Sequence, residues 1–442
     1  MKDHFLWGAP LLWIVLIFAP AAHADLVDIL RRIETDAPAL QAAGHRNQAA
    51  LANVRVARSR YFGSARVFAD GTEFDDPRLV GPISPPIALG ALKADAEQFG
   101  YGATLTLPLD INRRIGAAVD EQARLGDAAG HDVQRVRLVL FGQAVFLLRG
   151  LQELAGNRTA LLAQQKALQT NQAVVESRIR LGRSPRVEQL RIDAERKAIT
   201  GQLAALDGRE TGLRAALGAL MARGAYDGRI DPLGEPPPVL GVGPSSDLIG
   251  RPDILAAQSR VAAARARAKG AKREWLPGLG LEAGRLRNQG FATPTNDTWS
   301  VALKLNWEFW DGGRRNANID GAEAAVMAQR SDLDAVRYEA QRELTTALAT
   351  WRTAQQQFAA AEAGLVAAVE TENIQSDRFQ AGRISAADLV DAEAALATAR
   401  ATRSSALAQW WLADDQAHIA VGQAPRAYTD AATRPRKARN QP

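Results

Sequence analysis

The sequence predicts a mainly α-helical protein with four amphipathic β-strands per chain, built from an internal duplication. A turn between two long helical patterns occurs twice, around Gly182 and Gly382, which are 200 residues apart. Apolar residues recur every seven positions through both long patterns, which indicates coiled-coil packing. Before each long pattern, short segments alternate apolar and polar residues, as half-buried strands do. A fixed separation between equivalent features is typical of a structural repeat.

The composition argues against several functional classes. The chain has 442 residues and a formal net charge of +5, but its Lys and Arg are scattered among Asp and Glu, so a nucleic-acid partner has little support. It has no Cys, which excludes disulfides, thiolate metal sites, Cys nucleophiles and a lipid-modified N-terminal Cys. Its five His show no metal-ligand spacing, and no G-x-S-x-G motif is present. Neither a cofactor, nor a metal, nor enzyme activity is expected.

Residues 1–24 have the layout of a secretory signal peptide. Lys2 precedes an apolar stretch, residues 5–18, and Ala22-His-Ala24 has the form of an A-x-A cleavage site. The alternative is an uncleaved N-terminal anchor. No later stretch reaches the roughly 18 apolar residues of a membrane-spanning helix. We therefore expect an exported chain without such a helix.

The two repeats are expected at residues 25–223 and 251–422, each with a helix, a β-hairpin, a long helix, a turn and a returning helix. A Gly/Pro-rich connector, residues 224–250, joins them. A basic tail, residues 423–442, is expected to be disordered. The Arg pairs that precede the long helices, Arg113-Arg114 and Arg314-Arg315, are 201 residues apart.

The clearest strand is predicted at residues 299–309, where strict alternation gives one apolar face with an aromatic end. Its hairpin partner is expected at residues 279–285. The first repeat matches with residues 101–109 and a weaker partner around residues 65–69, separated by a Pro-rich loop, residues 70–98. The residues expected to face lipid on the clearest strand are Val301, Leu303, Leu305, Trp307 and Phe309.

A soluble sandwich also contains half-buried strands, but strands of about 9–11 residues with an apolar outer face fit a tilted membrane barrel. Four strands cannot close into a barrel, and lipid forbids an open sheet edge. Several copies must therefore combine their strands, and three copies would supply twelve. The helix from residue 114 to residue 181 would be about 100 Å long. Helices of that length are expected to form an extended bundle or tube.

Together these features resemble the TolC family of outer-membrane efflux proteins over nearly the whole exported sequence. The resemblance rests on the duplicated layout, on the turn at Gly382 followed by Asp388 and Asp391, on residues 244–254, and on residues 305–315. It implies a homotrimer whose 12-strand β-barrel lies in the outer membrane of a Gram-negative bacterium. The barrel would continue into a periplasmic α-helical coiled-coil tunnel that contacts a periplasmic adaptor. An inner-membrane pump would supply the energy for transport.

The resemblance also places functional residues at the two turns. A ring of carboxylates in a narrow pore could bind cations. Asp388 has a local alternative, because Ser385-x-x-Asp388 is also a capping-box pattern at a helix start. In the first repeat, Arg191 stands at the position of Asp391. The implied aperture residues are Asp388, Asp391 and Glu188, and the implied adaptor contacts are Arg178, Gly182, Arg183, Arg378, Gly382 and Arg383.

The implied function is that of a passive gated duct, the outer-membrane channel of a tripartite export complex that passes small toxic compounds from adaptor and pump to the exterior. The exit duct of a type I protein secretion system has the same architecture, and nothing in the tunnel sequence separates the two. An exported coiled-coil scaffold or adhesin would explain the heptads but not the amphipathic strands.

Overall fold

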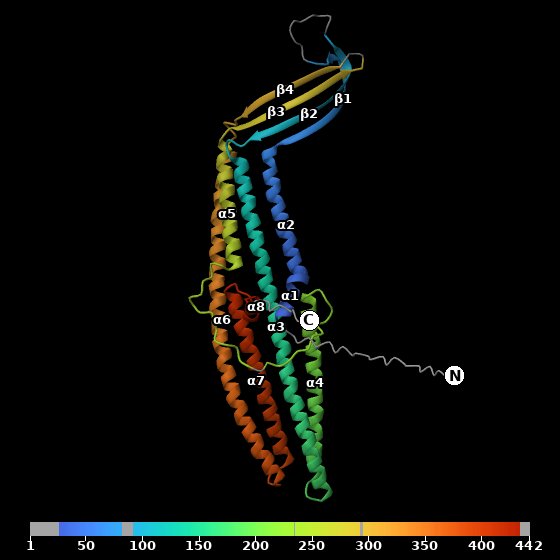
Figure 1. The fold of residues 1–442 in the computed structure, drawn as a ribbon, viewed down its shortest axis with the longest axis vertical. Coiled ribbons are helices and arrows are strands. Elements are labelled where there is room, and N and C mark those ends of the chain that lie inside the picture. Colours follow the sequence, from blue (N-terminus) through green and yellow to red (C-terminus); the bar gives the residue numbers. More distant parts are fainter. Residues whose placement is uncertain (1–25, 82–91, 234, 292–294, 434–442) are drawn as a thin grey trace, which may run out of the picture.

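The computed structural model describes residues 26–81, 92–233, 235–291 and 295–433. The molecule is elongated, with a four-stranded sheet at one end and long helices that run to the other end (Figure 1). The predicted signal peptide, residues 1–24, lies outside the described residues.

The same order of elements occurs twice. The first half contains α2 (Pro38–Ser59), η1 (Arg60–Phe62), β1 (Ser64–Leu79), β2 (Ala94–Leu109), α3 (Arg114–Arg180) and α4 (Arg186–Leu220). The second half contains α5 (Pro252–Lys272), η3 (Arg273–Trp275), β3 (Gly278–Gly290), β4 (Asn296–Asn306), α6 (Arg314–Gln380) and α7 (Ala386–Ala420). The first half is preceded by α1 (Leu26–Asp36), and the second is followed by α8 (Arg426–Thr433).

The long helices of the two halves correspond with a separation of 200 residues. α3 and α6 each have 67 residues and begin at Arg114 and Arg314. In the structure Arg114 therefore corresponds to Arg314. The two Arg pairs, which are 201 residues apart in the sequence, are offset by one residue from this correspondence. α4 and α7 have 35 residues each. The extra length of the first half lies in its hairpin, since β1 and β2 have 16 residues each, whereas β3 has 13 and β4 has 11.

The four strands form one antiparallel sheet in the order β1-β2-β3-β4. The central pairing, β2 with β3, joins the two halves of the chain and places Leu109 opposite Leu279. Within the described part of the chain, β1 and β4 each pair on one side. The sheet of a single chain therefore has two open edges.

The first hairpin is longer than the sequence predicted. Residues 70–79 and 94–98, which were expected in a Pro-rich loop, belong to β1 and β2. Pro77 lies within β1, where the register with β2 shifts between Glu73 and Arg78. Because an irregularity on an edge strand tolerates a residue without an N–H, the prolines did not end the strand.

The strand predicted at residues 299–309 is displaced toward the N-terminus. β4 ends at Asn306, which lies opposite Gly278 at the start of β3. Pro277, before β3, has no N–H with which to extend the ladder. Trp307 and Phe309 therefore lie beyond the strand, although both side chains are exposed. β3 also extends past residue 285, to Gly290.

The predicted heptad positions face the protein interior over much of both long helices. At about 1.5 Å per residue, α3 and α6 are each about 100 Å long. The small Ala residues at these positions in α6 let neighbouring helices approach closely. The buried heptad positions are Leu140, Leu154, Leu168 and Val175 in α3, and Val326, Leu333, Ala340, Ala354 and Ala361 in α6.

One stretch of α3 is long and apolar enough to cross a membrane by length and composition alone, contrary to the expectation from the sequence. This helix packs against α1, α2, α4, α5 and α7. We therefore assign its apolar residues to the core of the helical region.

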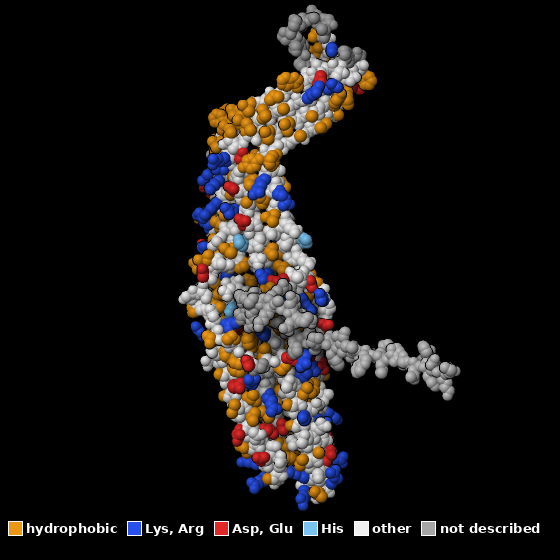
Figure 2. Space-filling view, in the orientation of Figure 1, with side chains coloured by type: hydrophobic (Ala, Val, Ile, Leu, Met, Phe, Trp, Pro, Cys, Tyr) orange, Lys and Arg blue, Asp and Glu red, His pale blue; other side chains and the backbone are white. Residues whose placement is uncertain are grey.

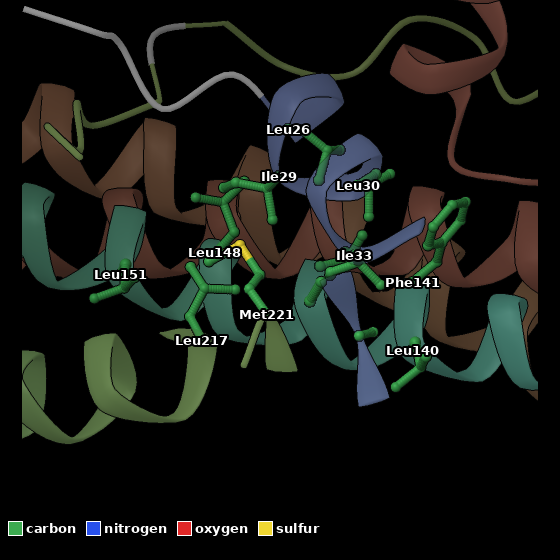
Figure 3. Packing of buried hydrophobic residues seen from close by; sticks show 13 residues of the cluster. Leu26, Ile29, Leu30, Ile33, Leu140, Phe141, Leu148, Leu151, Leu217 and Met221 are labelled. Carbon is green, nitrogen blue, oxygen red and sulfur yellow. The ribbon is translucent and has the colours of Figure 1, made fainter. Parts of the chain in front are cut away.

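Several apolar clusters hold the helices together, and two of them bear on the position of the turns. The equatorial cluster, halfway along the molecule, packs Leu30 and Ile33 of α1 against Phe141 and Leu148 of α3 and Leu217 of α4 (Figure 3). The tip cluster lies near the two turns and joins all four hairpin helices, so the two turns share one core. Its members are Leu168, Val175, Ile192, Ile199, Phe379, Ala386, Leu389 and Val390.

The tail expected to be disordered from residue 423 is partly helical. Residues 426–433 form α8, and the ring of Tyr428 lies 5.3 Å from that of Phe141. The Tyr428 hydroxyl donates a hydrogen bond to Glu34 at 2.6 Å. Contact with the equatorial cluster orders this segment, which is too short for its own periodicity to predict a stable helix. Residues 434–442 lie outside the described residues.

Candidate functional site

The two helix hairpins end in the same turn. Gly182 and Gly382 have φ angles of +64° and +71°, which glycine adopts without strain. In the first turn the amide of Arg183 donates to the carbonyl of Arg178 at 2.8 Å, and the equivalent bond in the second turn is 2.9 Å. This Schellman arrangement closes a helix C-terminus. Both glycines therefore shape the two turns at this end of the molecule.

Arg178 joins the two turns of one chain. Its Nη2 donates to the carbonyl of Phe379 at 2.6 Å and to that of Gln380 at 3.1 Å. Its guanidinium carbon lies 4.5 Å from the centroid of the Phe379 ring. A cation at the C-terminus of α6 also opposes the negative end of the helix dipole. Of the four arginines expected to contact an adaptor, Arg178 is thus half-buried against the second turn, whereas Arg183, Arg378 and Arg383 are exposed.

Asp388 forms the capping box that its sequence pattern allows. The Ser385 hydroxyl accepts from the Asp388 amide at 3.3 Å, and the Asp388 carboxylate accepts from the Ser385 amide at 3.0 Å. Hydrogen bonds from the Ser385 hydroxyl and amide lower the pKa of Asp388, and Arg191 lowers it further. Asp388 therefore stabilises the start of α7 whether or not it also faces a pore.

The other two acids expected at the aperture lie in different settings. Asp391 is exposed one turn further along α7. Glu188 is half-buried and accepts a hydrogen bond from the Ser184 hydroxyl. α4 begins after Pro185 without a side-chain cap, so the two turns differ at the start of the returning helix.

The two tips carry opposite charge. Residues 176–193 contain five Arg and three acidic residues, whereas residues 376–393 contain two Arg and four acidic residues. Lys and Arg gather at the α3/α4 tip in Figure 2. Acidic groups able to ring an aperture are therefore concentrated on the second tip.

The sheet has one broad apolar face. Val301, Leu303 and Leu305 are 61–66% exposed, and the register places Leu303 opposite Leu281 and Leu305 opposite Leu279. Residues opposite one another in an antiparallel pair lie on the same face. Hydrophobic side chains cover the sheet in Figure 2. The apolar face therefore extends over several strands and is wider than the one strand predicted from the sequence.

The structure also contains buried charges that the sequence analysis did not identify. Arg149 donates from Nε and Nη2 to Asp415 at 3.1 and 2.9 Å, and burial raises the pKa of Asp415. Glu393 is buried between α7 and α6, where burial and the neighbouring Glu372 raise its pKa to about 7. Acidic residues at inward positions of a helix, as in Ala413-Asp-Asp415, are the signal that could have revealed these groups.

Among the described residues, no group of three or more His, Cys, Asp or Glu could hold a metal ion. The acids at the tips are arranged along a helix rather than around a common centre.

Residues 243–422 match the sequence model of the family described as outer membrane efflux protein. The cation efflux system protein CusC of Escherichia coli is 26% identical over 169 residues, which are 36% of this chain and 35% of that protein. The chain thus matches about a third of the length of this curated relative.

Solved structures extend the likeness to the whole fold. The outer membrane protein VceC of Vibrio cholerae superposes with a TM-score of 0.74 at 18% identity and covers 90% of this chain and 96% of its own. The outer membrane channel CmeC of Campylobacter jejuni gives a TM-score of 0.75 at 16% identity, with 92% and 88% covered.

The matched family and both solved structures are described as outer-membrane proteins, which agrees with the outer-membrane location expected from the sequence. The helical part of the fold and the antiparallel sheet of four strands per chain agree with the predicted fold class. Residues 243–422 thus resemble the outer membrane efflux protein family in sequence, and the described chain has the fold of these solved outer-membrane proteins.

Proposed function

We propose that the protein is the outer-membrane channel of a tripartite export complex. Three copies combine their sheets into a 12-strand barrel, and their helices form a periplasmic tunnel that meets an adaptor at the tips. The tunnel is a passive duct for small toxic compounds supplied by an inner-membrane pump. Since a curated relative is named as a cation efflux component, metal cations are among the cargoes to test.

The observation that carries this proposal is the pair of open edges on an apolar sheet. Among the residues that the structure describes, β1 and β4 have no strand partner on their outer sides, and the side chains of one sheet face are apolar and exposed. Unpaired strand edges cannot remain in lipid, because their amides and carbonyls find no water there. Closure with further copies removes both edges. A soluble scaffold or adhesin would expose this apolar face to water, which is unfavourable.

The size and shape of the detergent-solubilised protein test the proposal. We expect a trimer that is elongated well beyond the roughly 100 Å of one long helix, observable by light scattering and electron microscopy. A monomeric or compact particle contradicts the duct. Export of a protein by the complex, in place of small compounds, would favour the alternative of a type I secretion exit.

Asp391 is the residue that we propose as the aperture group, with Asp388 and Glu188 next to it. Asp391 is exposed and its carboxylate is not part of the capping box. Three copies would bring three such carboxylates to the periplasmic mouth. The exposed arginines of the turns, Arg183, Arg378 and Arg383, are available to an adaptor at the same end.

Planar-bilayer recordings test this assignment. Asp391→Asn is expected to change the single-channel conductance and to weaken block by divalent cations, because the ring of charge at the mouth is lost. Glu370→Gln, which removes an exposed acid from α6 away from the turn, is the matched control. Unchanged conductance and unchanged cation block in Asp391→Asn would remove this residue from the aperture.

A further inference from the structure

We propose that the outer end of the sheet carries a docking surface for the phosphate groups of lipid A, the phosphorylated glycolipid of the outer leaflet. The surface consists of Arg285, Arg287, Asp297 and Tyr101 and is called the outer arginine cluster. The inference rests on the proposed function, which places the sheet in the outer membrane and the helices in the periplasm.

The strand register puts the outer arginine cluster on the apolar face. Arg285 lies opposite Trp299, and Arg287 lies opposite both Asp297 and Tyr101. Along β3, positions two apart lie on one face, so these arginines continue the row that begins with Leu279 and Leu281. Two guanidinium groups thus stand on the face that we assign to lipid.

Arg285, Arg287 and Asp297 lie near the connection between β3 and β4, and this end of the sheet is far from the helices (Figure 1). Trp307 is ten positions after Asp297, which corresponds to about 34 Å of extended chain. With a tilt of about 45°, this length covers about 25 Å along the membrane normal, the height of the apolar band of an outer-membrane barrel. Trp307 then marks the periplasmic boundary of the band, and Trp299 and the outer arginine cluster mark its outer boundary.

The two arginines of the cluster keep N–H donors that their contacts within the cluster do not use. Arg285 donates from Nε and Nη2 to Asp297 at 3.1 and 2.5 Å. Arg287 donates from Nη2 to Asp297 at 3.1 Å and from Nη1 to the Tyr101 hydroxyl at 3.3 Å. Two cations against one carboxylate leave a net positive charge and further guanidinium N–H donors. The two arginine side chains are 70% and 43% exposed.

Phosphate is the anion that this arrangement fits. The planar guanidinium group binds phosphate oxygens through paired N–H donors. Charged side chains on a lipid-facing surface are unfavourable unless they reach polar headgroups. At the outer boundary of the barrel, the phosphate-bearing headgroups belong to lipid A. Phe99 stacks beside Tyr101, with ring centroids 5.8 Å apart, and gives the acyl chains an aromatic border.

Native mass spectrometry of the full protein in detergent tests the proposal, because it reports the oligomer mass and bound lipid together. The probes are diphosphoryl lipid A, dephosphorylated lipid A and phosphatidylglycerol. We expect a preference for diphosphoryl lipid A that falls about tenfold in the double variant Arg285→Gln/Arg287→Gln, the usual scale for loss of charge-assisted hydrogen bonds. Asp297→Asn is expected to retain or increase binding, since it frees both arginines.

The matched control removes two cations from the opposite face of the same sheet, Arg66→Gln/Lys304→Gln. These residues alternate with the apolar positions of β1 and β4, and lipid A binding is expected to persist. An equal loss in the control, no loss in the arginine double variant, or equal affinity for phosphatidylglycerol would overturn the assignment. A particle that is not a trimer would instead contradict the proposed function, so the two failures are distinguishable.

Discussion

At the residue scale, the buried Glu393 makes the α6/α7 hairpin sensitive to pH. Its carboxyl is buried beside Glu372 of α6, and Arg400 of α7 offsets only part of this effect, so the pKa rises from its ordinary value of 4.5 to about 7. Between these values the folded protein binds a proton that the unfolded chain has lost. The free energy of unfolding therefore falls as pH rises through this window.

We expect Glu393→Gln to remove this pH dependence. The wild-type unfolding midpoint should be lower at pH 8 than at pH 5, whereas the variant should differ little between the two, because its amide keeps the shape of the protonated acid. Differential scanning calorimetry at both pH values gives the comparison. Glu370→Gln, at an exposed position of α6, should retain the wild-type difference, and a flat wild-type profile would contradict the argument.

At the element scale, the two hairpins of one chain act as a unit at their tips. The tip cluster contains residues of α3, α4, α6 and α7, and Arg178 adds two hydrogen bonds and a ring contact from α3 to the end of α6. In the proposed channel, opening of the periplasmic mouth must move the hairpins together or break these contacts. The repeat supplies a matched position, Arg378, which is exposed.

Arg178→Gln should lower the free energy of unfolding by about 2 kcal/mol, since it removes charge-assisted hydrogen bonds and a cation–π contact. Arg378→Gln should change it by less than about 0.5 kcal/mol, as is usual for an exposed side chain. Hydrogen–deuterium exchange at the tips is the local measurement, and faster exchange is expected in the first variant alone. Equal effects would show that the two positions are equivalent in the assembled protein.

At the scale of the whole molecule, the helices alone are compatible with a soluble bundle, and the sheet is the feature on which the proposed membrane barrel of several copies rests. Its apolar face has no covering layer among the described residues, and both edges are open. Closure into a barrel satisfies the backbone groups at the edges and gives the apolar face to lipid. The central β2–β3 pairing holds both halves of the chain in one continuous wall.

Leu303→Arg should prevent insertion into the outer membrane. A cation on the lipid face near the midplane costs about 2–4 kcal/mol in each strand that carries it, and a trimer would carry three. Ala302→Arg, on the alternate face of β4, should still insert, because in the proposed barrel that face lines the water-filled interior. Membrane fractionation and heat-modifiable migration on gels distinguish the two. Normal insertion of Leu303→Arg would place this face away from lipid.

The sequence by itself determined the features that depend on local patterns. The turns at Gly182 and Gly382, the capping box of Ser385 and Asp388, and the 67-residue helices all follow from residue type and spacing. The apolar face of β4 was visible in the alternation of residues 299–305. These features need no distant partner, so a short stretch of chain contains the information that specifies them.

Tertiary structure alone decided the features that depend on distant partners. β1 continues past Pro77 because β2 holds it, β4 ends at Asn306 because β3 begins opposite, and α8 is ordered because Phe141 lies beneath Tyr428. Arg178 was predicted at a partner surface, yet its guanidinium binds carbonyls about 200 residues away in the chain. No local pattern encodes such contacts, since their free energy comes from surfaces that only the folded chain brings together.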